Sequence, residues 1–147
     1  MAPSTQDIRH ARFADLDPLV AYRLWALRSD VFVVEQDCPY LDLDGRDVED
    51  GTWHVWAEGE VGDPVATLRL LDDGEAMRIG RVATARGARG AGVGAELVRV
   101  ALGLAGERPV VLDAQAHLVD WYAGFGFEVS GRGFVEDGIP HVSMRRG

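Results

Sequence analysis

The feature of this chain that most constrains its fold is a loop of glycine and arginine between an apolar run and a helical pattern. Glycine stands at four of the eight positions of 87–94, Arg89 lies among them and Arg86 directly precedes them. The apolar positions of 76–83 predict a strand before the loop, and those of 92–105 predict a helix after it. Glycine leaves backbone N–H groups accessible, a helix N-terminus attracts anions, and arginine makes forked contacts with phosphate oxygens. The segment therefore predicts a site for a phosphorylated ligand.

The rest of the chain alternates between helical and strand patterns without a repeat or a linker. Asp15–Pro18 has the signals of a helix start, and apolar residues at helical spacing continue to Val31. A short helix is predicted at 117–123, and strands are predicted at 52–58, 64–71, 109–113, 127–130 and 140–145. A glycine- and acid-rich loop joins the last two strands. We predict one domain over 1–147 with an α+β fold, in which helices cover both faces of a central mixed, mostly antiparallel sheet.

Composition narrows the classes of partner. The net charge of −9 argues against nucleic acid, no apolar run approaches the ~20 residues of a membrane helix, and residues 1–7 lack the pattern of a secretory signal. Cys38 is the single cysteine, so no internal disulfide or cysteine metal cluster can form. All 15 basic residues are arginine, which rules out a lysine Schiff base and a Gly-Lys-Ser/Thr phosphate loop. We expect a cytoplasmic protein that uses no metal and binds neither nucleic acid nor membrane.

The charge is unevenly distributed along the chain. Residues 30–63 hold eleven acidic residues against Arg46 alone, a sum of −10, whereas 78–99 hold five arginines against Glu96, a sum of +4. The basic segment suits an anionic ligand and the acidic segment suits a cationic one. An acidic loop that is simply solvated and binds no ligand explains the acidic segment equally well.

The glycine loop also fits a second pattern. Residues 90–95 satisfy the dinucleotide-binding sequence G-x-G-x-x-A, and Asp113 falls at the distance at which an acidic residue holds a ribose. Only 53 residues follow Gly94, too few for the remaining strand–helix units of such a fold. Arg86 and Arg89 also crowd a turn that normally relies on backbone and helix dipole. A dinucleotide site and a purely structural glycine turn remain as alternatives.

Four segments carry a resemblance to a known family. Arg89-x-x-Gly92-x-Gly94, between an apolar strand and a helix, resembles the acyl-CoA signature of the GNAT N-acetyltransferases. The order of predicted elements is similar to that family as well. Three further segments resemble its ElaA-like branch, and the similarity extends from about Tyr22 to Met144. These segments are Val31-Phe-Val-Val-Glu-Gln-Asp-Cys-Pro-Tyr40, Ala114-Gln-Ala-His117 and Glu136-Asp-Gly-Ile-Pro-His141.

The resemblance implies transfer of an acetyl group from acetyl-CoA to a primary amine. It implies that the backbone of Val82, Ala83 and Thr84 pairs with the pantetheine arm. It also implies that the N–H groups of Arg89, Gly90, Ala91, Gly92, Val93, Gly94 and Ala95 hold the pyrophosphate. A backbone N–H of Val82 or Ala83 is placed to stabilise the developing oxyanion. Tyr122, before a Gly-Phe turn, resembles the tyrosine that protonates the departing thiolate, and its alternative is a core tyrosine with a satisfied hydroxyl.

The residues leave the general base open. Candidates are the acids and histidines Glu35, Asp44, Asp47, His54, His117, Glu136 and His141. We favour Glu35, because it interrupts an apolar run at a helix end, where burial can raise the pKa of a carboxyl group. His54 alternates with apolar strand residues and faces either a cleft or solvent, and His117 and His141 suit structural roles. A water chain without a dedicated base is the further alternative.

These expectations lead to an acetyl-CoA-dependent N-acetyltransferase that acts by direct attack within a ternary complex. A relay through Cys38 is disfavoured, because neighbouring carboxylates make it a poor thiolate. The acidic segment favours a cationic acceptor, either a small-molecule amine or a peptide amine. The last hairpin is a candidate surface for a homodimer. An acyl-CoA-binding sensor without catalysis and the dinucleotide binder are the alternative functions.

Overall fold

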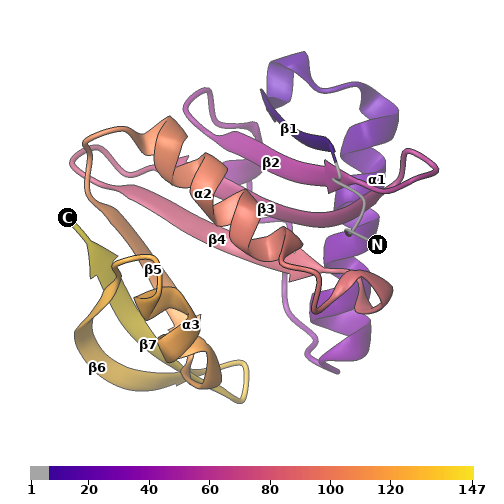
Figure 1. Ribbon diagram of the computed structural model, residues 1–147. Helices are drawn as coiled ribbons and strands as arrows, with labels where there is room; N and C mark the ends of the chain where they lie inside the picture. Colours follow the sequence, from indigo (N-terminus) through magenta and orange to yellow (C-terminus); the bar gives the residue numbers. More distant parts are fainter. Residues whose placement is uncertain (1–6) are drawn as a thin grey trace.

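A single mixed sheet organises the chain in the computed structural model, which describes residues 7–147 (Figure 1). The spatial order is β1-β2-β3-β4-β5-β7-β6, and only the β4–β5 pair is parallel. The strands are β1 Asp7–Arg12, β2 Trp53–Glu58, β3 Pro64–Asp72, β4 Met77–Thr84, β5 Val110–Gln115, β6 Glu128–Glu136 and β7 Ile139–Arg146. The predicted α+β fold with a mostly antiparallel mixed sheet is confirmed.

Helices cover both faces of the sheet, as predicted. Helix α1 (Pro18–Arg28) lies behind the sheet in Figure 1, and α2 (Val93–Ala105) and α3 (Val119–Ala123) lie in front. The predicted start of α1 is confirmed, because the Asp17 side chain accepts a hydrogen bond from the Leu19 N–H at 2.9 Å. A π-helical segment, Ser29–Glu35, continues α1 toward the sheet. No helix within residues 7–147 is long and apolar enough to cross a membrane.

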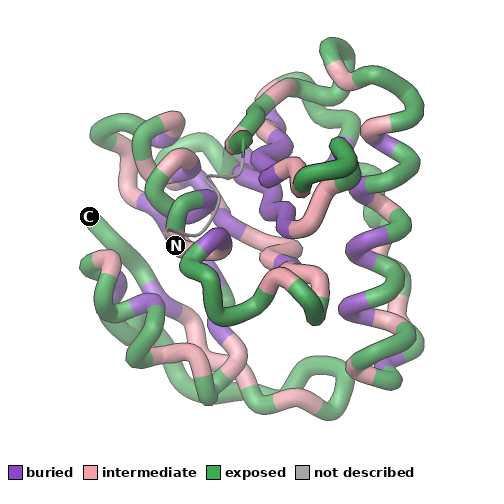
Figure 2. Tube along the Cα trace, turned by 45° about the vertical axis from the view of Figure 1, so that its right-hand side comes forward, coloured by how far each residue is buried: buried purple, intermediate pink, exposed green. Residues whose placement is uncertain are grey.

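Two clusters of buried side chains hold these layers together. The larger lies between the sheet and the apolar side of α2, where Leu97, Val98 and Ala101 are fully buried. The smaller joins α1 and its π-helical continuation to β4 through Leu27, Val31, Phe32 and Ala83. Figure 2 shows buried residues along the inner strands and on the inward side of the helices, with exposed residues at the periphery.

Strands β4 and β5 separate soon after they meet, and this separation positions the candidate site. Their ladder contains only the pairs Met77–Val110 and Arg78–Val111, while β5 pairs with β7 along its whole length. The register of β4 against β3 shifts by one residue where Arg81 adopts a φ of 52°. The later part of β4 therefore turns away from β5 and leaves its backbone edge without a strand partner.

Several elements differ from the sequence prediction, mainly at the edges of the sheet. Strand β1 was not predicted, because only Ile8 and Ala11 among its residues are partly covered. Strand β6 is longer than predicted, and each of its residues is exposed, so it carries no regular apolar alternation. A turn at Asp137–Gly138 replaces the predicted loop before β7. The predicted helix at 117–123 divides into a 3₁₀ turn, Ala116–Leu118, and α3. Residues 1–6, where a leader was predicted to be absent, lie outside the described residues.

Candidate active site

The glycine loop borders a cavity of about 640 Å³ between β4, α2 and α3, called the larger cavity below. Its wall includes nine of the ten predicted cofactor-binding residues: Val82, Ala83, Thr84, Arg89, Gly90, Gly92, Val93, Gly94 and Ala95. The tenth, Ala91, is exposed and does not line the cavity. The sequence therefore located the loop and strand that form this wall, and binding by these residues stays a prediction.

The loop has the backbone of an anion site. Gly90 and Gly92 adopt φ values of 85° and 81°, and Gly92 caps α2 without a side-chain hydrogen bond. Residues of the first helical turn line the cavity without a side-chain cap at Gly92, and the positive end of the helix dipole lies at the same place. A Cβ at Gly94 would lie 3.7 Å from both Thr84 and Trp121, so α2 approaches β4 closely here. These features fit a phosphate group.

The edge of β4 that faces the cavity offers further backbone donors. The Ala85 N–H donates to the Val65 carbonyl at 2.7 Å, so at this end of the ladder alternate N–H groups point toward β3. By this alternation, the intervening N–H groups of Val82 and Thr84 are expected on the edge of β4 away from β3. Val82 and Ala83 were the two residues predicted to donate a backbone N–H to the oxyanion, and this alternation favours Val82.

Glu35 lies on the wall of the larger cavity, but its environment differs from the prediction. Both carboxylate oxygens accept hydrogen bonds from Arg89 at 2.7 Å, and Arg89 also donates to the Thr84 carbonyl at 3.0 Å. The hydrogen bonds from Arg89 lower the pKa of Glu35. The expectation that burial raises this pKa was wrong, because the ion pair with Arg89 outweighs it. An ionised carboxylate held in this way is a weak proton acceptor.

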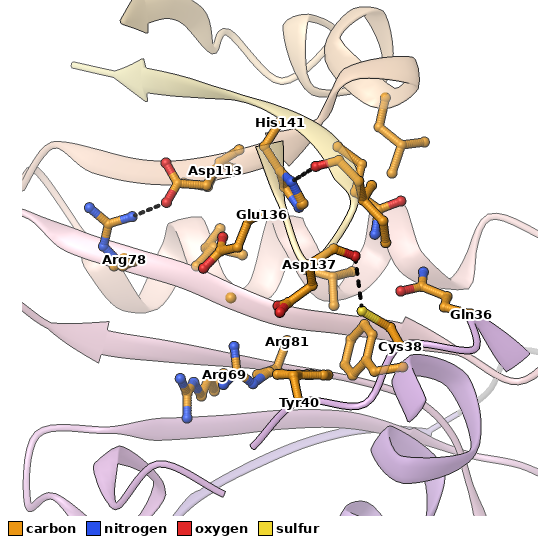
Figure 3. A pocket seen from close by; sticks show the side chains of 18 of the residues that line it. Gln36, Cys38, Tyr40, Arg69, Arg78, Arg81, Asp113, Glu136, Asp137 and His141 are labelled. Carbon is orange, nitrogen blue, oxygen red and sulfur yellow. Dashed lines mark hydrogen bonds and ion pairs between the residues drawn. The ribbon is translucent and has the colours of Figure 1, made fainter. Parts of the chain in front are cut away.

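A second cavity of about 410 Å³, called the smaller cavity, lies between β4, β5 and the β6–β7 hairpin (Figure 3). Six residues line both cavities: Phe32, Gln36, Val82, Gln115, Leu118 and Tyr122. The two spaces therefore adjoin along the separated strands. One can hold a ligand bound to the glycine loop, and the other can hold a second molecule that reacts with it.

Tyr122 lies at this junction and is only 5% exposed. Its ring makes edge contacts with Trp121 and Phe127, at centroid distances of 4.8 and 6.0 Å. Burial raises the pKa of Tyr122 to about 12, so the phenol stays protonated near neutral pH. No hydrogen bond joins its hydroxyl to any residue between Asp7 and Gly147, in contrast to a core tyrosine with a satisfied hydroxyl.

The acidic segment is largely neutralised by arginines. Asp47 accepts hydrogen bonds from buried Arg28 at 2.7 and 3.2 Å and from Arg69 at 3.2 Å. Asp44 accepts from Arg69 at 2.7 and 2.8 Å, and those hydrogen bonds lower its pKa. The pKa of Asp47 is also lowered, because the two guanidinium groups outweigh the effect of burial. Much of the acidic segment is therefore neither a free cation-binding surface nor a solvated loop.

Asp42 belongs to the same network. It accepts from Arg28 at 3.0 Å and from the Tyr40 hydroxyl at 2.9 Å, and it lies 2.9 Å from Arg81 Nε. Asp42, Asp44 and Asp47 with Arg28, Arg69 and Arg81 are called the buried ion network below. It joins α1 and the loop before β2 to β3 and β4, along one wall of the smaller cavity.

Two of the acidic residues that lack an arginine partner within residues 7–147 lie at the hairpin turn. Glu136 and Asp137 line the smaller cavity, and neither forms an ion pair within residues 7–147 (Figure 3). The Asp137 carbonyl accepts a hydrogen bond from the buried Cys38 thiol at 3.2 Å. Burial raises the pKa of this thiol, in agreement with its expected poor reactivity. The turn is thus fastened to the loop after the π-helical segment.

The three candidate histidines occupy different environments. His54 is 1% exposed, contacts Trp25 edge-on and bonds through Nε2 to the Asp47 carbonyl at 2.8 Å, so it faces neither cleft nor solvent. His117 lines the larger cavity, and His141 lines the smaller one. Within residues 7–147, no three side chains of the metal-binding types converge.

Sequence reasoning missed part of both walls. Phe32, Gln36, Gln115 and Leu118 line both cavities without having been singled out. Phe32, Gln36 and Gln115 lie within segments quoted for the resemblance, which was the available signal. Trp121, beside Gly94 in the larger cavity, directly precedes Tyr122 in the segment that resembles the family, but it was not singled out either.

Comparisons with known proteins agree with this geometry. The model of an acetyltransferase (GNAT) domain matches residues 38–146. ElaA of Escherichia coli K12 is 40% identical in sequence, over 96% of this chain and 94% of that protein. Its crystal structure superposes with a TM-score of 0.89, at 36% identity, over 97% and 100% of the two chains. An acyl-CoA N-acyltransferase from Pseudomonas aeruginosa gives the same TM-score at 41% identity, with the same coverage.

The chain therefore belongs to the GNAT acetyltransferase family, whose members are acyltransferases. Within that family it is a homologue of ElaA, and the predicted resemblance to the ElaA-like branch is confirmed. A more distant aminoglycoside 6'-N-acetyltransferase, crystallised with coenzyme A, shares the fold at 13% identity and a TM-score of 0.72, over 94% and 96% of the chains. The dinucleotide-binding alternative was wrong, since β4–β5 is the one parallel pair in the described sheet. Asp113 contacts Arg78 and Ser143.

Proposed function

We propose that the protein is an N-acetyltransferase that moves an acetyl group from acetyl-CoA directly to a primary amine in a ternary complex. The observation that carries the proposal is the junction of two cavities at Val82 and Tyr122. One cavity has the backbone of a phosphate site, and the other has room for an acceptor. Two reactants held side by side in this way need no covalent acyl-enzyme step.

In this proposal acetyl-CoA occupies the larger cavity and supplies an acetyl thioester. The N–H groups of Gly92–Ala95 at the start of α2 bind its pyrophosphate, and the free edge of β4 at Val82 and Thr84 binds the pantetheine arm as a neighbouring strand would. Arg89 lies beside the same loop, with its guanidinium held by Glu35 and by the Thr84 carbonyl. The proposed contacts with acetyl-CoA use backbone groups and therefore need no particular side chain.

Two groups then act at the junction. The Val82 N–H donates to the carbonyl oxygen as it gains negative charge, and loss of such a donor typically costs about 3 kcal/mol of barrier. The Tyr122 hydroxyl donates its proton to the departing sulfur. Its lack of a protein partner within residues 7–147 leaves the hydroxyl available for this transfer.

The acceptor in this proposal is a primary amine with additional positive charge. The support comes from Glu136 and Asp137, which line the smaller cavity and have no arginine partner in the described part of the chain. The acidic segment of residues 30–63 no longer supports a cationic acceptor, because its carboxylates in the buried ion network are paired with arginine. A diamine or a basic peptide should therefore react faster than a neutral amine, most clearly at low salt.

The first test is thermal stabilisation by acetyl-CoA, desulfo-coenzyme A and NAD. A ligand at 100 times its dissociation constant should add about 2.7 kcal/mol of stability. We expect a shift with both coenzyme A compounds and none with NAD. Thiol release in the presence of primary amines then separates the enzyme from a sensor that binds acetyl-CoA without turnover.

A matched pair of variants locates the binding site. Gly92→Glu places a carboxylate in the phosphate site and should abolish the shift, whereas Gly62→Glu, in a turn that lines neither cavity, should keep it. Both glycines have φ near +80° and open space around a built Cβ, so the backbone strain is comparable. An equal shift in both variants would refute the assigned loop.

A further inference from the structure

His141 is placed where an acceptor would enter. It lies on β7, opposite Gln115 of β5 and Phe134 of β6 in the two ladders, and it lines the smaller cavity (Figure 3). Gln115 lines both cavities, so its neighbour His141 lies near the junction. The Phe134 ring stacks on the imidazole at a centroid distance of 5.6 Å and an interplanar angle of 16°, which fixes the ring plane.

The hydrogen bond of His141 determines which nitrogen carries the proton. Nδ1 lies 2.7 Å from the Ile139 carbonyl oxygen, which can only accept. A neutral ring must therefore carry its hydrogen on Nδ1, and Nε2 has a free lone pair. Within residues 7–147, no hydrogen bond engages Nε2. Buried His54 has the opposite arrangement, with Nε2 bonded to a carbonyl.

We propose that His141 Nε2 is the proton acceptor for the amine, an inference that rests on the proposed acetyl transfer. The amine nitrogen forms its bond to the acetyl carbon and loses one proton to Nε2. The carbon–sulfur bond breaks, and the sulfur gains one proton from Tyr122. The proton on the imidazolium then returns through solvent to the Tyr122 phenolate, so amine and thioester become amide and thiol with the protein unchanged.

The charges around the ring suit this role. The charged and titratable side chains that line the smaller cavity with His141 are Cys38, Tyr40, Arg69, Arg78, Arg81, Asp113, Tyr122, Glu136 and Asp137. Each of the three arginines is paired with aspartate, and Arg78 lies between Asp73 and Asp113. Glu136 and Asp137 are unpaired within residues 7–147 and can stabilise an imidazolium as it forms.

Glu35 is the competing candidate, and the geometry disfavours it. Both of its oxygens are engaged by Arg89, and it lines the larger cavity rather than the smaller one. His141 combines a free nitrogen, a fixed ring and a place on the acceptor side.

The tautomer is tested first, without any substrate. Nitrogen NMR of protein labelled with ¹⁵N-histidine should show one ring with a protonated Nδ1 and a bare Nε2, and that signal should be missing from His141→Asn. A protonated Nε2 on His141 in the neutral ring would overturn the proposal.

The kinetic test compares His141→Asn with His10→Asn, on exposed β1 away from both cavities. The amide N–H of asparagine can still donate to the Ile139 carbonyl, but asparagine has no basic nitrogen that could accept the proton of the amine. With acetyl-CoA and 1,5-diaminopentane or the best amine of a panel, His141→Asn should lower kcat by about 10²–10⁴-fold. The KM for acetyl-CoA should stay within about twofold, and His10→Asn should match the parent protein.

A rescue experiment separates proton transfer from packing. Added imidazole should restore part of the rate of His141→Ala in a saturable manner, because the smaller cavity has room for it. A kcat for His141→Asn within about threefold of the parent, or a loss in His141→Ala that imidazole leaves unchanged, would refute the role. Absence of turnover by the parent protein with every amine would instead refute the proposed function.

Discussion

Replacing Tyr122 by phenylalanine is the sharpest perturbation of the proposed site, because it removes a single oxygen atom. The ring keeps its edge contacts with Trp121 and Phe127. The hydroxyl has no hydrogen-bond partner between Asp7 and Gly147, so its loss leaves no protein group unpaired. A structural tyrosine and a catalytic one therefore predict opposite outcomes for this variant.

The expected magnitudes follow from that geometry. With no hydrogen bond lost, the free energy of unfolding should change by less than about 0.5 kcal/mol, which corresponds to a Tm shift below about 2 °C. Loss of a positioned general acid typically slows a reaction about 10²–10⁴-fold, or about 3–5 kcal/mol of barrier. The KM for acetyl-CoA should change little, because the phosphate site lies at the start of α2.

Tyr40→Phe provides the matched comparison for stability. The Tyr40 hydroxyl donates to Asp42 at 2.9 Å, within the buried ion network. Removing a hydrogen bond to a charged group costs about 1.5–3 kcal/mol, so this variant should lower Tm by roughly 3–12 °C. Thiol release and thermal unfolding are measured on both variants. If Tyr122→Phe loses stability like Tyr40→Phe, or keeps its full kcat, the assignment of Tyr122 as the acid is refuted.

Two further predictions concern the buried ion network. Arg28→Met should destabilise the protein by about 3–5 kcal/mol in urea unfolding, because it leaves Asp42 and Asp47 buried with fewer partners. The exposed pair Arg23–Asp63 supplies the control, and Arg23→Met should cost less than about 1 kcal/mol; similar losses would contradict the argument. The pKa values of Asp44 and Asp47 are lowered in the folded protein, so these carboxylates stabilise it above about pH 4, the ordinary pKa range of aspartate in the unfolded chain. This stabilisation is lost as the pH falls through the pKa values of the two groups in the folded protein. The urea concentration at the unfolding midpoint should therefore decrease as the pH is lowered from 6 to 3, and the decrease should be smaller in Asp44→Asn. An equal decrease in the variant would exclude Asp44 as a source of the pH-dependent stability.

The sequence predicted the larger cavity more completely than the smaller one, for a physical reason. The loop at 87–94 is contiguous, and its glycines report directly on the backbone that a phosphate needs. The smaller cavity is built from β4, β5, the hairpin and the segment after α1, which meet only because β4 and β5 separate. That separation depends on the bulge at Arg81, and no local pattern marks a non-glycine residue with positive φ.

Glu35 illustrates the same limit for electrostatics. The sequence shows a carboxylate interrupting an apolar run, and burial alone would raise its pKa. Its partner Arg89 lies 54 positions away, and the contact exists because the π-helical segment ends beside the glycine loop. The sign of a pKa shift depends on such partners, so it could not be obtained from neighbours in the chain.

The exclusive use of arginine has a structural consequence that links the network to the acceptor. Asp47 receives forked hydrogen bonds from Arg28 and a further one from Arg69, which in turn binds both oxygens of Asp44. One guanidinium thus holds two carboxylates at fixed angles, whereas a lysine ammonium acts as a point charge. Because the network satisfies its own carboxylates, it forms a rigid, nearly neutral wall, and the unpaired charge of the smaller cavity is concentrated at the hairpin turn. In the proposed reaction, an acceptor is therefore expected to be oriented from the side of Glu136 and His141, which is where the proton transfer requires its amine.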